Sequence, residues 1–234
     1  MRAIIALLLL GLLAGAPTAS ALAEGAEPFI TAKQLDLSLI LPPPSATDSN
    51  ETKAELAELL QIQAARTPEQ VALAQADAEE NVWRFADVLG PKFTRDALPK
   101  VTALFDRVVE TESAVVDPAK QVWQRPRPHM VSAEVKPVVR LSSSGAYPSG
   151  HATVGTLMGI ILAEMVPEKR AEIQARSRQF AENRMIAGIH FRSDVTAGRI
   201  AGAAIAFTIL PHEDFQALYQ PAKAELRAAL GLGD

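Results

Sequence analysis

Helical signals run through almost the whole of this chain, and strand signals are sparse. Apolar residues recur at helical spacing within stretches that proline and glycine end, as with Leu98, Val101 and Phe105. The one strand candidate, residues 135–141, contains Pro137, which weakens it because proline cannot donate to a strand ladder. The sequence therefore predicts an all-α, single-domain helical bundle.

Local caps and breakers predict where the helices begin and end. Thr67, Pro68 and Gln70 have the pattern of a capping box with proline in the first turn. The predicted helices begin near Glu51 and then cover 68–88 in one or two pieces, 94–113, a short piece opened by Asp117-Pro118, 149–165, 168–187, 190–210 and 213–229. Residues 129–147 between them are predicted to form a loop.

The first 23 residues have the pattern of a secretory signal peptide. Arg2 supplies the positive charge, residues 3–16 are apolar, and Ala21-Leu22-Ala23 places small residues at the cleavage positions. An uncleaved anchor is the alternative, but the apolar run is shorter than the roughly 18 residues that a spanning helix needs. We therefore expect export to the periplasm or medium, with no stable membrane span after cleavage.

The rest of the chain divides into two predicted parts. Residues 24–46 form an extended leader, since Pro42-Pro43-Pro44 excludes a helix there, and residues 47–234 form the helical domain. The chain has no cysteine, so its stability must come from the core, which 48% hydrophobic residues can build. The net charge of −4 argues against nucleic acid as a partner.

Basic residues and histidines in the second half follow a three-part pattern. Lys120 and Arg127 give K-x6-R-P, Pro148 to His151 gives P-S-G-H, and Arg184, His190 and Asp194 give R-x5-H-x3-D. Three cations can neutralise phosphoryl oxygens, one imidazole can attack, a second can protonate a leaving group, and a carboxylate can orient the attacking ring. This set needs no metal ion and no cofactor.

Ser149 and Gly150 lie just before an apolar helical stretch. Their amides are therefore predicted at a helix N-terminus, which binds anions, and Gly150 lets a phosphate approach the backbone closely. His151 would stand on the first turn facing the same anion. The alternative is a serine cap followed by a solvent-exposed histidine.

The other two parts of the pattern are weaker when taken alone. His190 and Asp194 are four residues apart and would share one face of a helix, but such pairs are mostly structural. Arg184 lies on the other side of the predicted helix break at Gly188 from His190. The alternative interpretation is that Arg184 is an ordinary surface arginine. Spacing alone does not decide whether Arg125 or Arg127 enters a pocket, and a solvated basic loop is the alternative there.

Taken together, these motifs resemble the bacterial class A non-specific acid phosphatases, within the superfamily of type-2 phosphatidic-acid phosphatases and vanadium haloperoxidases. The resemblance covers most of the mature chain, through residues 41–44, 120–128, 145–151 and 184–198. The resemblance implies that Arg127, and not Arg125, is the arginine that enters the pocket. The chain departs from the family pattern at Asn183, where serine is usual, and we expect that change to retune the site without abolishing it.

The resemblance implies a role for each site residue. His190 is the nucleophile and forms a phosphohistidine, Asp194 orients it, and His151 protonates the leaving alcohol and then activates water. The phosphoryl oxygens are held by Lys120, Arg127, Ser149, Gly150 and Arg184. The implied partners are small-molecule phosphate monoesters. The resemblance also makes a homo-oligomer possible, because family members often self-associate.

Three other functions remain open at this stage. A vanadate-dependent haloperoxidase would use His190 to ligate vanadate, although the short chain and the leader favour the phosphatase. A lipid phosphatase would share the pocket, and a non-catalytic phosphate-binding helical protein would not need His190 with Asp194. For the phosphatase we expect an acidic optimum, because His190 must be neutral while His151 is protonated.

Overall fold

The computed structural model describes residues 26–233, and within that range all regular secondary structure is helical, as predicted. The predicted signal peptide lies outside the described residues. The α-helices are α1 (Asn50–Ala65), α2 (Pro68–Ala76), α3 (Ala86–Leu89), α4 (Pro99–Trp123), α5 (Pro128–Val131), α6 (Gly150–Met165), α7 (Arg170–Ile186), α8 (Arg192–Ile209) and α9 (Glu213–Leu230). Short 3-10 turns are η1 (Leu37–Leu39), η2 (Val82–Phe85) and η3 (Pro167–Lys169).

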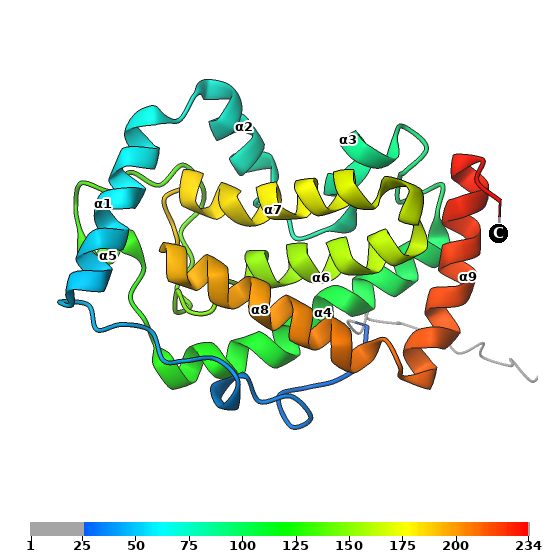
Figure 1. Ribbon diagram of the computed structural model, residues 1–234, viewed down its shortest axis with the longest axis horizontal. Coiled ribbons are helices and arrows are strands. Elements are labelled where there is room, and N and C mark those ends of the chain that lie inside the picture. Colours follow the sequence, from blue (N-terminus) through cyan, green and yellow to red (C-terminus); the bar gives the residue numbers. More distant parts are fainter. Residues whose placement is uncertain (1–25, 234) are drawn as a thin grey trace, which may run out of the picture.

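Helix α6 lies at the centre of the bundle. It packs most extensively against α8 and α7, and α4 covers it from another side, while α9 crosses the far end of α4 (Figure 1). The approach of α8 to α6 depends on glycine. A Cβ atom at Gly198 would lie 2.4 Å from the Ser149 carbonyl oxygen, and one at Gly202 would lie 2.4 Å from that of Thr153. These contacts bring the start of α8 against the start of α6.

The residues before α1 are part of the core. Phe29, Ile30, Leu37 and Leu41 are buried in the main hydrophobic cluster. The Phe29 amide donates a 2.9 Å hydrogen bond to the Thr111 hydroxyl of α4. This segment therefore packs against the domain instead of extending from it.

Helix α4 is longer than predicted. The sequence suggested a separate short helix opened by Asp117-Pro118, but α4 continues through Pro118 to Trp123, so that prediction is wrong. Proline at 118 leaves the Ala114 carbonyl without its helical donor. The Ala32 amide of the leader donates to that carbonyl at 3.2 Å and satisfies it. A long-range contact thus removes the cost that local rules assign to this proline.

The other helix predictions are close to the structure. The capping box at Thr67 and Gln70 is confirmed, but α2 ends at Ala76 and the predicted continuation to 88 breaks into η2 and α3. The predicted helices 149–165, 168–187, 190–210 and 213–229 correspond to α6, α7, α8 and α9. The strand candidate 135–141 is irregular.

None of the described helices is, by itself, long and apolar enough to cross a membrane. Helices α8 and α9 pass that test only as a pair, and a bend of 98° separates them.

Candidate active site

A cavity of about 290 Å³ opens at the end of the bundle where α6 begins and where α7 passes to α8. Six of the eight predicted site residues line it: Lys120, Arg127, Gly150, His151, Arg184 and His190. The other two, Ser149 and Asp194, are fully buried and lie outside this lining. Segments far apart in the chain therefore meet around one cavity.

The start of α6 forms one wall of this cavity. Ser149 is the N-cap, and its hydroxyl accepts a hydrogen bond from the Ala152 amide at 3.3 Å, so this side chain caps the helix. Gly150 faces the cavity. A Cβ atom there would lie 2.9 Å from Glu112 Oε1 and 3.2 Å from Lys120 Nζ. Glycine therefore lets the Glu112 carboxyl group and the Lys120 ammonium pack directly against the start of α6.

His190 lies at the base of the cavity and is 2% exposed. Its Nε2 is 3.1 Å from Arg127 Nη1. A guanidinium group only donates hydrogen bonds, so Nε2 must be the acceptor and the ring proton must be on Nδ1. Nδ1 in turn faces Asp194 Oδ2 at 3.4 Å. In this tautomer Nε2 carries no proton, and its lone pair accepts the hydrogen bond from Arg127.

The histidine and the aspartate do not share a helix as expected. Helix α8 begins at Arg192, so His190 precedes it and only Asp194 lies in its first turn. Asp194 Oδ2 also accepts a 2.8 Å hydrogen bond from the Phe191 amide. The pair is thus arranged by the start of α8 and not by helical periodicity.

The surroundings of His190 disfavour its protonated form. Burial lowers its pKa well below the ordinary value, and the charges of Arg127 and Arg184 lower that pKa further. These effects favour the neutral ring, which suits a nucleophile.

Arg125 and Arg127 have different positions, which the spacing of the sequence did not resolve. Arg127 lines the cavity, and its Nε donates to the Ser144 carbonyl at 3.0 Å. Arg125 lies behind the cavity, where Nη1 is 2.6 Å from Asp194 Oδ1 and Nη2 is 2.7 Å from Glu55 Oε2. Arg125 is therefore a positioning residue that sequence reasoning did not identify.

The charge of Asp194 depends on that contact. Burial raises the pKa of Asp194 to about 7, although the Arg125 guanidinium and the Phe191 amide act in the opposite direction. Arg125 thus favours the carboxylate form that accepts the His190 ring proton.

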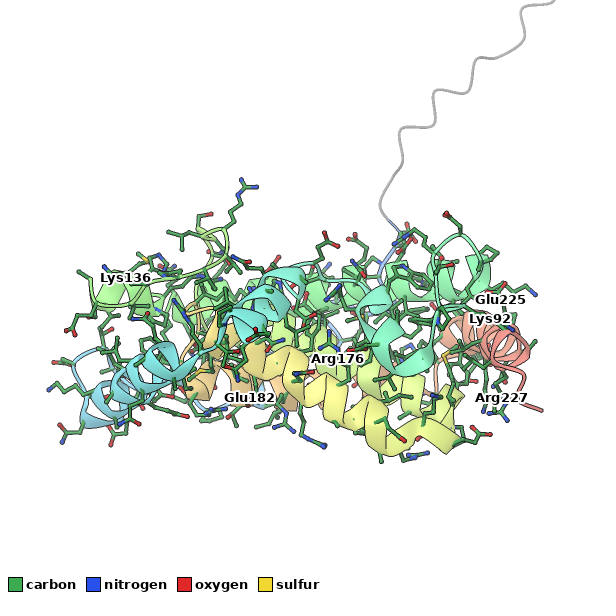
Figure 2. The ribbon with its side chains drawn as sticks, turned by 90° about the horizontal axis from the view of Figure 1, so that it is seen from above. Lys92, Lys136, Arg176, Glu182, Glu225 and Arg227 are labelled. Carbon is green, nitrogen blue, oxygen red and sulfur yellow. The ribbon has the colours of Figure 1, made fainter. Side chains whose placement is uncertain are left out.

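Arg184 is 2% exposed, and burial lowers its pKa to about 10, so it stays charged at neutral pH. Its Nη1 donates to the Asp77 carbonyl oxygen at 3.3 Å, whereas its buried Nε has no partner. The Asp77 carboxylate pairs with Arg176 of α7, which is labelled near the middle of Figure 2. Asn183, at the position where the family usually has serine, donates to Asp77 Oδ2 at 2.7 Å. Asn183 therefore helps fix α7, the helix that carries Arg184.

Both ring nitrogens of His151 have acceptor partners. Nδ1 is 2.6 Å from Glu80 Oε1, and Nε2 is 3.0 Å from the Ala78 carbonyl oxygen. Only a protonated ring can donate to both acceptors. Burial raises the pKa of Glu80, but the hydrogen bond and charge of His151 outweigh it and leave that pKa lowered.

Two glutamates in the cavity lining were missed from the sequence. Glu80 follows α2 in a segment without a motif, and Glu112 lies on α4, eight residues before Lys120. Glu112 is 3% exposed and sits among the buried residues of the α4 stripe, including Val108 and Val115. A charged residue at an apolar position of an amphipathic helix was the one signal available.

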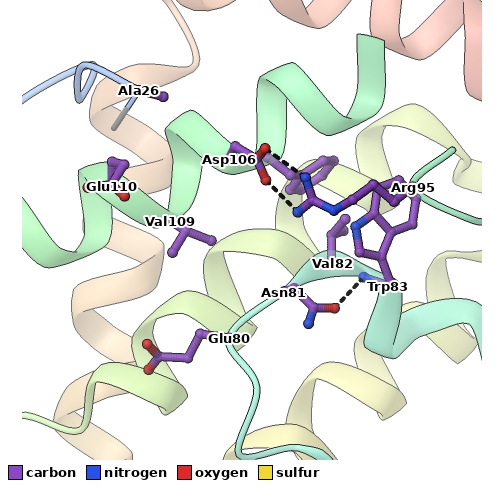
Figure 3. Close-up of a pocket in the computed structure, with 10 residues that line it drawn as sticks. Ala26, Glu80, Asn81, Val82, Trp83, Arg95, Asp106, Val109 and Glu110 are labelled. Carbon is purple, nitrogen blue, oxygen red and sulfur yellow. Dashed lines mark hydrogen bonds and ion pairs between the residues drawn. The ribbon is translucent and has the colours of Figure 1, made fainter. Parts of the chain in front are cut away.

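Glu80 also lines a second, neighbouring cavity of about 460 Å³. Trp83 and Asn81 contribute to its wall, and Arg95 closes one side through paired contacts of 2.9 and 2.8 Å to Asp106 (Figure 3). The cavity that holds the predicted site residues therefore has a larger cavity beside it, and Glu80 lines both.

Comparison with known families agrees with this geometry. The PAP2 superfamily model matches residues 108–215, which include every motif residue described above. The chain is 30% identical to a non-specific acid phosphatase of Providencia stuartii over 60% of this chain and 59% of that protein. It is 32% identical to an acid phosphatase of Zymomonas mobilis over 68% and 63% of the two chains. The alignments thus span about three fifths of these relatives' own length.

Known structures share the fold. A bacterial vanadium-dependent iodoperoxidase superposes with a TM-score of 0.57 and 18% identity, covering 73% of this chain and 52% of that one. A transmembrane PAP2-type phosphatidylglycerolphosphate phosphatase of Bacillus subtilis gives 0.51 and 18%, with 77% and 95% covered. Residues 108–215 are therefore similar to the PAP2 superfamily, and the helical bundle has the fold of both solved structures.

Proposed function

We propose that this protein is an exported acid phosphatase that hydrolyses phosphate monoesters through a phosphohistidine on His190. The observation that carries the proposal is the pairing of Arg127 with His190 Nε2, which leaves a neutral, unprotonated nitrogen facing a cavity lined by cations. The similarity to acid phosphatases of Providencia stuartii and Zymomonas mobilis supports the same activity.

In the first step, His190 Nε2 gives up its hydrogen bond from Arg127, which turns to a phosphoryl oxygen, and attacks the phosphorus atom as the bond from phosphorus to the ester oxygen breaks. Arg127, Arg184, Lys120 and the Gly150 amide neutralise the phosphoryl oxygens. The imidazolium of His151 gives a proton to the departing alcohol, for which its Nε2 must exchange the Ala78 carbonyl for the ester oxygen.

In the second step, a water molecule attacks the phosphohistidine. Neutral His151 takes a proton from this water, the bond from phosphorus to Nε2 breaks, and phosphate leaves with His190 neutral again. Between the two steps the His190 ring carries a positive charge, which the Asp194 carboxylate beside Nδ1 stabilises. The cycle consumes one water per ester and regenerates both histidines.

Hydrolysis of p-nitrophenyl phosphate by the wild type and by His190→Ala tests the proposal. The wild type should turn over, the variant should lose turnover, and His212→Ala should serve as a control because His212 lies at the start of α9 away from the cavity. Alkaline quenching of the wild type during turnover should trap a phosphorylated His190. An acid-side optimum is expected, and a rate that still rises at pH 9 would contradict it.

The rival functions give different results in the same assays. A vanadate-loaded protein that brominates a dye but does not hydrolyse p-nitrophenyl phosphate would overturn the proposal in favour of a haloperoxidase. Phosphate binding without hydrolysis of any monoester in a panel would favour a binding protein.

A further inference from the structure

Glu112 is the buried group of the cavity to which the proposed reaction assigns no role. Its side chain comes from α4 and is almost completely buried, with an exposed fraction of 3% for the residue. Oε1 has no hydrogen-bond partner, whereas Oε2 has only a long contact of 3.4 Å to the Ser113 hydroxyl. A buried, unpartnered carboxyl oxygen is costly, so a native site that keeps one calls for an explanation.

The position of Glu112 points to the phosphoryl group. Its Oε1 would be 2.9 Å from a Cβ atom at Gly150, and Lys120 Nζ would be 3.2 Å from the same point. Glu112, Lys120 and Gly150 all line the cavity. The unpartnered oxygen of Glu112 therefore borders the cavity in which the proposed reaction places the phosphoryl group.

The charged groups around Glu112 come from each element of the cavity. Glu80 follows α2, Asp117 and Lys120 lie on α4, His151 lies on α6, Arg184 lies on α7, and Arg127, Arg140 and His190 lie in the connecting segments. Glu80 and Asp117 oppose ionisation of Glu112, whereas Lys120 favours it. Glu80 and Asp117 come from different segments, so their effect on the ionisation of Glu112 does not depend on one local contact.

We propose that Glu112, as a neutral carboxylic acid, donates a hydrogen bond to the bound phosphoryl group, so that phosphate binding is coupled to a proton on this side chain. An ionised Glu112 would instead repel the phosphate and leave both anions poorly solvated. The inference rests on the proposed function, because it adds a ligand to the same phosphoryl group.

Burial supports the neutral form. Desolvation, followed by the charge of Glu80, raises the pKa of Glu112 to about 8. The group therefore keeps its proton through the acidic and neutral range and loses it in mildly alkaline solution. A bound phosphate would hold the proton more tightly still, because it adds negative charge nearby.

Isothermal titration of inorganic phosphate into the wild type, Glu112→Gln and Glu110→Gln tests this coupling. Glutamine keeps a donor at the same place and cannot ionise, and Glu110 is an exposed control on the same helix. At pH 6 the wild type and Glu112→Gln should bind phosphate equally. At pH 9, one unit above a pKa of about 8, the wild type should bind roughly tenfold more weakly than Glu112→Gln. Glu110→Gln should follow the wild type.

A ratio of the two affinities that stays the same at both pH values would overturn the inference. Proton uptake gives a second measure, from titrations at pH 8 in buffers of different ionisation enthalpy. The wild type should take up roughly half a proton more than Glu112→Gln on binding phosphate. Equal uptake would also contradict the proposal.

A third measurement needs no variant. Infrared spectra of the wild type with phosphate at pH 8 should keep a band of a protonated carboxyl group, and its absence would overturn the inference even if Glu112→Gln failed to fold. These tests use inorganic phosphate and no turnover. A wild type that hydrolyses no ester but shows the expected coupling would contradict the phosphatase activity and leave the role of Glu112 in phosphate binding intact. Normal hydrolysis without coupling would contradict the role of Glu112 and leave the phosphatase activity intact.

Discussion

Two regions of the molecule contribute different groups to the cavity. Residues 108–215, which match the PAP2 model, supply the basic and histidine side chains that line the cavity. Residues 26–98 supply buried or half-buried acceptors that hold those groups in place. Glu55 pairs with Arg125, the Asp77 carbonyl accepts from Arg184, and Glu80 pairs with His151.

This division shows that cations alone do not make the site. Each basic group would lose rotamer freedom and be desolvated if it pointed into a buried cavity without support. Residues 26–98 supply acceptors that hold Arg125, Arg184 and His151 in place around the cavity. Variants of the two regions should therefore fail differently: those of residues 108–215 in chemistry, and those of residues 26–98 in stability and with smaller losses of rate.

Arg184→Met should give the largest effect of the variants that separate the two regions. A unit-charge pair at ~4 Å is worth roughly 4 kcal/mol at an effective dielectric near 20, so kcat/KM for p-nitrophenyl phosphate should fall about 10²–10³-fold. The thermal midpoint should not fall in parallel, because the variant also removes a desolvated charge. Arg178→Met, an exposed change on the same helix, is the control. A loss below tenfold would show that Arg184 does not contact the phosphoryl group.

Asp77→Asn should act on the other region, mainly through stability. The Asp77 carboxylate is fully buried and pairs with Arg176, so removing its charge takes away the buried partner of Arg176 and leaves only the exposed Asp87; this should cost on the order of 3–5 kcal/mol in unfolding free energy. Denaturant unfolding measures this cost, and kcat/KM should fall about tenfold because α7 loses an anchor.

Asp87→Asn is the matched control for that change, since Asp87 contacts the same Arg176 at 3.0 Å but its side chain is 53% exposed. Its cost should stay below about 1 kcal/mol. Equal destabilisation by both variants would mean that burial of Asp77 does not decide the effect.

The fold was largely predictable because its signals are local. Proline, glycine and capping residues end most helices, and α6 to α9 lie within a few residues of their predicted bounds. The error at α4 has a non-local cause. Pro118 was read as a helix start, and only the contact from the Ala32 amide to the Ala114 carbonyl makes it acceptable inside a helix.

The candidate site was predictable only in the region that carries motifs. Ordered spacing indicated His190, His151 and the cations, and the structure brings them around one cavity. The positioning residues Arg125 and Asp77 act through partners more than 60 residues away, so no local pattern identifies them. Asn183 was recognised as a departure, but its contact to Asp77 required the fold.

Glu80→Gln should give the smallest effect. The Glu80 carboxylate contacts His151 Nδ1 at 2.6 Å and orients the ring beside the cavity. Because this ion pair is partly exposed, its loss should lower kcat/KM for p-nitrophenyl phosphate by only about two- to fivefold. Glu79→Gln, an exposed neighbour, should leave kcat/KM unchanged. A gain in kcat/KM would mean that Glu80 acts on the site by repelling phosphate, and would place it with Glu112 instead of with the positioning residues.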